Sequence, residues 1–192
     1  MARMGLMVNP TSGRNTGAQV GTEALTLLRA AGVDILDLSA ADARSAMEQG
    51  REAIASGAVD RIVVAGGDGM VHLGANLCAG TGVALGVIAA GTGNDIAREL
   101  GLPVRDAAKS VERILSGGTR VVDAVRHTTA TGQDTWFLGV LAAGFDAVVN
   151  ERANQLRWPK GPMRYNLAIF RELPVFRAIP YGLVLDGQRI DT

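Results

Sequence analysis

Short apolar runs alternate with segments of helical periodicity through the first part of the chain. The runs occupy residues 5–8, 33–38, 62–65 and 85–88, and each ends in glycine or in polar turn residues. Between them, apolar residues recur every three or four positions, as on the buried side of an amphipathic helix. Short apolar runs of this kind are typical of buried parallel strands, and their alternation with helices predicts a parallel sheet covered on both faces. The pattern therefore predicts an α/β domain.

The alternation ends near residue 125. Residues 135–142 and 181–185 are predicted as strands, with turns at Thr131-Gly132 and Asp186-Gly187. The helical section between them is interrupted at residues 158–162. Strands that no longer alternate with short helices predict a second, β-richer domain. We therefore expect a nucleotide-binding α/β domain at 1–125, followed at 126–192 by the start of a β-sandwich. Because so few residues cannot close a sandwich, we expect its other strands in a longer gene product.

Glycine-containing loops follow three of the predicted strands, at residues 9–14, 66–69 and 91–95. In parallel α/β sheets, ligands bind at the edge where the carboxyl ends of the strands lie, and all three loops fall on that edge. A glycine loop that opens a helix presents free N–H groups and the positive end of the helix dipole to phosphate. The convergence predicts an anionic ligand, a nucleotide. Taken singly, each loop fits a structural turn equally well, and no Walker A motif is present.

Asp68 is the one carboxylate inside the loop Gly66-Gly67-Asp68-Gly69. It is not suited to bind phosphate directly, because two anions repel each other. Three roles stay open on this reasoning. Asp68 orients Mg²⁺ through water, it takes a proton from an attacking hydroxyl, or it only fixes the turn.

The net charge of the whole chain is zero, with 19 basic and 19 acidic residues, so we expect no nucleic-acid partner. Residues 151–192 are basic, however, with 7 Lys/Arg against 4 Asp/Glu, and they hold five aromatic residues. Two interpretations remain: contact with anionic lipid headgroups, or a solvated helix whose aromatic side chains fill a second core. The single Cys78 fits a reducing compartment, and no apolar run is long enough to span a membrane. We expect a cytoplasmic protein, with peripheral contact at the inner membrane face if the lipid interpretation holds.

Three motifs stand in order along the chain: Asn9-Pro10-Thr11-Ser12-Gly13, Gly66-Gly67-Asp68-Gly69 and Gly91-Thr92-Gly93-Asn94-Asp95-Ile96-Ala97-Arg98. Together they resemble the diacylglycerol kinase catalytic domain family, which includes sphingosine kinases, and the soluble bacterial branch in particular. Residues 136–145 and 158–165 are also similar to that branch. The resemblance implies a Rossmann-like N-terminal domain of the NAD kinase/phosphofructokinase-like type and a C-terminal β-sandwich. It places ATP in the cleft between the two domains.

The resemblance also implies roles for individual residues. The implied nucleotide-binding positions are Asn9, Pro10, Thr11, Ser12, Gly13, Arg14, Ser39, Gly66, Gly67, Asp68, Gly69, Met70 and Thr92. Asp68 and Asp95 are the implied catalytic residues, and with Asp123 they would organise Mg²⁺ through water. Direct metal ligands, and the acidic residue that bacterial members use as a base, would lie beyond Thr192. Met70 stands where the family usually has threonine, which puts the affinity for phosphate in doubt.

The leading hypothesis is an ATP- and Mg²⁺-dependent lipid kinase that converts diacylglycerol to phosphatidic acid at a membrane surface. An NAD kinase-like enzyme with a soluble substrate is one alternative. A nucleotide-binding fragment that lacks its catalytic half is another. The sequence leaves open whether the chain forms a homodimer.

Overall fold

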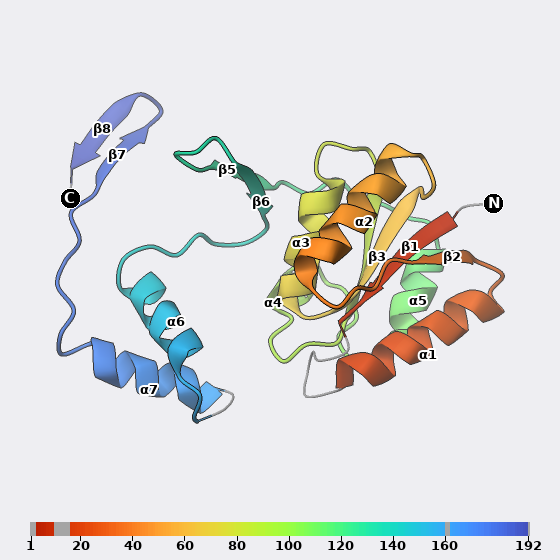
Figure 1. The fold of residues 1–192 in the computed structure, drawn as a ribbon, viewed down its shortest axis with the longest axis horizontal. Helices are drawn as coiled ribbons and strands as arrows, with labels where there is room; N and C mark the ends of the chain where they lie inside the picture. The colour runs from red at the N-terminus through yellow and green to blue at the C-terminus, as the bar shows by residue number, and fades with distance from the viewer. Residues whose placement is uncertain (1–2, 10–15, 160–161, 192) are drawn as a thin grey trace. The chain divides into compact units, whose positions relative to one another are not determined.

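The structure, a computed structural model, describes residues 3–9, 16–159 and 162–191 (Figure 1). The chain divides into two compact units, Met1–Gly139 and Val140–Thr192, which are described separately below.

A parallel sheet forms the centre of the first unit. Its four strands are hydrogen-bonded in the order β2-β1-β3-β4, and every neighbouring pair is parallel. The strands are β1 (Arg3–Val8), β2 (Asp34–Asp37), β3 (Arg61–Gly66) and β4 (Ala84–Ala89). They coincide with the four predicted apolar runs, so the predicted α/β fold with a parallel sheet is confirmed.

Helices cover both faces of this sheet (Figure 1), because successive side chains of a strand point to opposite faces. In β3, Ile62 and Val64 pack on one face while Val63 and Ala65 pack on the other, and all four are fully buried. The first face is covered by α2 (Ala43–Ala55) and α3 (Asp68–Cys78), with α4 (Asp95–Glu99) at its end. The second face is covered by α1 (Thr16–Ala30) and α5 (Ala107–Leu115).

Aspartate side chains fix where two of these helices begin. Asp42 Oδ1 accepts a hydrogen bond from Ser45 N at 2.9 Å, and Asp106 Oδ1 accepts one from Lys109 N at 2.9 Å. These bonds stabilise the ionised carboxylates and lower the pKa of both groups. Asp42 is therefore the N-cap of α2, and Asp106 is the N-cap of α5.

A β-hairpin of β5 (Val125–Thr128) and β6 (Asp134–Phe137) completes the first unit. The Asn76 side chain of α3 holds it: Nδ2 donates to Trp136 O at 2.7 Å, and Oδ1 accepts from Trp136 N at 2.8 Å. The strand predicted at 135–142 is therefore too long. It ends at Phe137, because its partner β5 begins at Val125, directly opposite. The domain boundary expected between residues 125 and 126 stays a prediction.

The second unit contains a helix pair and a hairpin. Helices α6 (Phe145–Gln155) and α7 (Pro162–Glu172) pack around Val149, Ala153 and Ala168. Strands β7 (Gly182–Leu185) and β8 (Gln188–Asp191) form an antiparallel pair joined at the predicted Asp186-Gly187 turn. Among the described residues, no helix has both the length and the hydropathy needed to cross a membrane.

Candidate functional site

The loops after β3 and β4 touch each other backbone to backbone. A Cβ built on Gly91 would lie 2.4 Å from Gly67 Cα, and a Cβ built on Gly67 would lie 3.2 Å from Gly91 Cα. Because β3 and β4 are neighbouring parallel strands, their carboxyl ends bring the two loops to the same edge of the sheet. The close approach therefore needs glycine at position 91, while a side chain at position 67 would require a shift of only a few tenths of an ångström.

Asp68 joins the two loops with its side chain. It lies in the first turn of α3, and its Oδ1 accepts a hydrogen bond from Ile96 N at 3.0 Å. Its other carboxylate oxygen points towards Gly93: Asp68 Oδ2 and Asp95 Oδ2 lie 3.0 and 3.3 Å from the position that a Gly93 Cβ would take. The structure thus brings the two expected catalytic carboxylates to one glycine, and gives Asp68 a structural contact as well.

The beginning of α3 is open to an anion. Gly67 is its N-cap, and no side chain caps the helix there. The first N–H groups of a helix have no partner within the helix, and together with the helix dipole they favour a bound anion. Met70, one turn further on, has its N–H bonded to Gly67 O at 2.9 Å and its side chain packed under Gly66.

Asn94 fixes the second loop from inside. It is 1% exposed and has a left-handed backbone conformation, with φ of 60°. Its Oδ1 accepts from Gly91 N at 2.8 Å and its Nδ2 donates to Gly91 O at 2.8 Å. Our sequence reasoning did not select Asn94 as a site residue. A signal was present, because asparagine is among the few residues that adopt this conformation readily.

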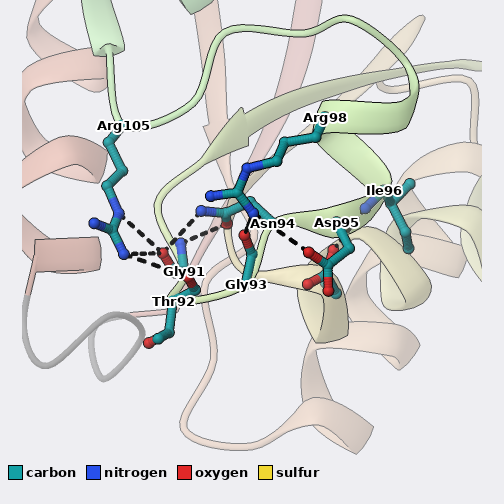
Figure 2. A network of polar contacts seen from close by, with 9 residues as sticks. Gly91, Thr92, Gly93, Asn94, Asp95, Ile96, Arg98 and Arg105 are labelled. Atoms are coloured by element: carbon teal, nitrogen blue, oxygen red, sulfur yellow. Dashed lines mark hydrogen bonds and ion pairs between the residues drawn. The ribbon is translucent and has the colours of Figure 1, made fainter. Parts of the chain in front are cut away.

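Two arginines hold the same loop from outside (Figure 2). Arg98 Nη1 donates to Gly93 O and forms an ion pair with Asp95 Oδ1 at 3.3 Å. Arg105 Nε and Nη2 each donate to Gly91 O at 3.2 Å, and Nη2 also reaches Thr92 O at 3.4 Å. Our sequence reasoning did not assign either arginine to the site, and no sequence pattern would have identified Arg105.

The first glycine loop is only partly described. Asn9 N donates to Ala65 O at 3.0 Å and extends the pairing of β1 with β3. Ser39 lies beside it: its Oγ accepts from Val8 N at 3.0 Å. The expected nucleotide-binding residues Pro10, Thr11, Ser12, Gly13 and Arg14 lie outside the described residues.

Asp123 is exposed on the segment between α5 and β5, and it has no hydrogen-bonding or ionic partner in the described part of the chain. Residues 3–9, 16–159 and 162–191 contain no group of three His, Cys, Asp or Glu residues that could hold a metal ion. Asp68 and Asp95 still fit Mg²⁺, which is commonly bound by one or two carboxylates together with substrate phosphates and water.

The first unit is a parallel α/β domain with two glycine loops at the carboxyl ends of neighbouring strands, which is the edge where ligands bind in proteins of this fold class. Comparison with known proteins identifies the family. The profile described as "Diacylglycerol kinase catalytic domain" matches residues 3–127, and that described as "YegS C-terminal NAD kinase beta sandwich-like domain" matches residues 139–192. The chain belongs to the diacylglycerol kinase catalytic domain family, as the three motifs predicted.

Individual relatives agree with this assignment. The chain is 41% identical over 181 residues to a diacylglycerol kinase of Mycobacterium tuberculosis, covering 94% of this chain and 58% of the relative. It is 29% identical to that of Bacillus subtilis, covering 98% and 61%. A crystal structure of a putative diacylglycerol kinase from Bacillus anthracis matches with a TM-score of 0.65 at 26% identity, covering 98% and 62%. The chain thus spans about three fifths of the length of these relatives.

Proposed function

We propose that the protein is an ATP-dependent lipid kinase that phosphorylates the hydroxyl of diacylglycerol. The observation that carries the proposal is the contact between the two glycine loops, with carboxylate oxygens of both Asp68 and Asp95 close to Gly93. Membership of the family supports kinase chemistry, and the relatives named above are called diacylglycerol kinases. The product would be phosphatidic acid.

In this proposal the chain binds and positions the phosphates of ATP. The open N-terminus of α3 and the backbone of the second loop would face the phosphates, and Asp68 and Asp95 would hold hydrated Mg²⁺. When bound, that ion neutralises charge on the phosphates. The lipid oxygen forms a bond to the γ-phosphorus as the bond to ADP breaks. Its proton passes to a base or water outside this set of residues. Catalysis of this kind rests mainly on positioning and electrostatics.

Transfer of labelled γ-phosphate by the full-length gene product tests the proposal, with diacylglycerol in micelles and NAD offered in parallel. We expect label in the lipid. Label in NAD alone would refute the lipid kinase and favour the NAD kinase-like alternative. ATP binding and phosphate transfer measured on the 192-residue chain itself test the second alternative, because a non-catalytic fragment binds ATP and transfers nothing.

Asp68→Asn separates chemistry from structure at the site. The amide oxygen can still accept the bond from Ile96 N, so we expect the melting temperature to stay close to that of the parent protein. Turnover should fall by roughly two to four powers of ten, because the charge that organises the metal is lost. Asp60→Asn is the matched control, since Asp60 is exposed and its carboxylate has no partner among the described residues. A parent-like turnover for Asp68→Asn would reduce Asp68 to a structural residue.

We also propose that the second unit contacts an anionic membrane where the lipid is met. Trp158 and Phe170 are 77% and 74% exposed, and Phe170 lies on α7 beside Arg171. Such aromatic and basic side chains suit the headgroup region. Flotation with vesicles should depend on anionic lipid and should weaken in Phe170→Ser/Arg171→Gln. Equal binding to neutral and anionic vesicles would contradict this role.

A further inference from the structure

Arg105 lies at the second glycine loop in an unusual backbone conformation. Its φ is 56°, in the left-handed region that side chains other than Gly, Asn and Asp rarely adopt. Its N–H donates to Ala89 O at 2.7 Å, and Val104 forms a parallel bridge with Ala89. The segment therefore runs along the end of β4, and it delivers Arg105 to the edge of the sheet where the loop begins.

The guanidinium group of Arg105 holds two consecutive carbonyl groups of the loop. Nε and Nη2 both donate to Gly91 O, and Nη2 also reaches Thr92 O. Asn94 Nδ2 donates to the same Gly91 oxygen. Figure 2 shows Arg105 and Asn94 reaching Gly91 from opposite sides. The guanidinium presents its N–H donors on separate nitrogens in a rigid, planar fork. A lysine ammonium has only one nitrogen, on a flexible stem, and cannot reproduce this arrangement.

The orientation of these carbonyls also fixes the N–H groups that follow them. In a trans peptide the C=O of one residue and the N–H of the next point in opposite directions. The peptides that join Gly91 to Thr92 and Thr92 to Gly93 are trans. The N–H groups of Thr92 and Gly93 therefore point away from Arg105, and neither has an acceptor in the described part of the chain. Successive free backbone N–H groups form an anion-binding concavity.

We infer that Arg105 is a positioning residue for the nucleotide: it holds the loop carbonyls so that the Thr92 and Gly93 N–H groups face a phosphate. This inference rests on the proposed function, in which that loop binds ATP. Arg105 acts through the loop backbone and does not itself bind the phosphate. The strained φ at Arg105 agrees with this role, because glycine would adopt that conformation more easily but would leave the carbonyls without the fork.

Two substitutions at Arg105 test the inference. Arg105→Lys keeps the positive charge and loses the fork, so the dissociation constant for ATP should rise roughly tenfold, as expected for one or two lost hydrogen bonds. Arg105→Gly relieves the backbone strain, so it should weaken ATP binding as much while the melting temperature changes little. Arg120→Lys is the matched control, because Arg120 Nη2 also donates to a backbone carbonyl, Leu100 O at 2.6 Å, away from the loop. It should bind ATP as the parent does.

The NMR chemical shifts of the loop amides distinguish a positioning role from a merely structural one. If Arg105 were only structural, its substitution would not change how these amides respond to ATP. In the parent, the Thr92 and Gly93 amides should shift on addition of ATP, and in Arg105→Lys they should shift less at the same concentration. Parent-like ATP affinity in Arg105→Lys, or Thr92 and Gly93 amides that do not respond to ATP in the parent, would overturn the inference. A failure of the proposed function would give a different experimental result from a failure of this inference. If label goes to NAD instead of lipid, the lipid kinase proposal falls while the effect of Arg105 on ATP affinity stands.

Discussion

A methyl group on Gly91 should force the two glycine loops apart. In Gly91→Ala the Cβ would lie 2.4 Å from Gly67 Cα and 2.9 Å from Asn94 Oδ1, where ordinary contacts lie at 3.4–4 Å. The nearest obstacle is backbone, so no side-chain rotation relieves it, and the loops must separate by about 1 Å. Overpacking of this kind costs about 1–3 kcal/mol, and weakening the two Asn94 bonds adds about 1 kcal/mol.

We therefore expect Gly91→Ala to lower the free energy of unfolding of the first unit by about 2–4 kcal/mol. For a unit of this size, that corresponds to a fall of about 10 °C in melting temperature. Trp136 reports on the first unit, and a Trp158→Phe background leaves it as the sole tryptophan signal. Urea and thermal unfolding followed by Trp136 fluorescence then measure the loss.

The control lies in the other glycine motif. Gly69 is exposed in α3, and a Cβ there would meet nothing within 4 Å. Gly69→Ala should stabilise the protein by about 0.5–1 kcal/mol, because glycine is a poor helix former. Our account of the loop contact is wrong if Gly91→Ala melts within about 2 °C of the parent, or if Gly69→Ala is equally destabilised.

Two further predictions concern buried groups. Asn94→Asp places a carboxylate oxygen against Gly91 O where a donor stood, so we expect a loss of about 2–4 kcal/mol in urea unfolding at neutral pH. The loss should shrink at acid pH, where the new carboxyl is protonated and can donate, and an unchanged loss at low pH would contradict the assigned bond. Burial raises the pKa of the Cys78 thiol to about 12, so a thiol reagent at pH 8 should label Cys78 in urea and leave the folded protein unlabelled. Rapid labelling of the folded protein would show that Cys78 is accessible.

The elements of the first unit could be predicted because their signals are local. The four apolar runs predicted as strands each depend on a few neighbouring residues, and all four appear as β1 to β4. The strand predicted at 135–142 was too long, because the end of a strand depends on where its partner begins, and the composition of the strand does not reveal this.

The carboxylates and glycines of the candidate site could be selected from the sequence, but the contacts that hold them could not. Asp68 and Asp95 were selected from motifs, and they do meet at Gly93. The bond from Ile96 N to Asp68 and the fork of Arg105 depend on the exact path of the loop backbone. Periodicity and composition contain no information on that path, so neither contact could be derived from the sequence.

Helix α3 is held by hydrogen bonds at both of its ends, so it can transmit a displacement from one end to the other. Asp68, in its first turn, is bonded to the loop after β4, and Asn76 holds the hairpin at Trp136. Eight residues of α-helix span about 12 Å, and the helix is stiff along its axis. A displacement of the hairpin along that axis is therefore carried to Asp68 almost undiminished. Within the first unit, the hairpin and the loop after β4 are therefore mechanically coupled through α3.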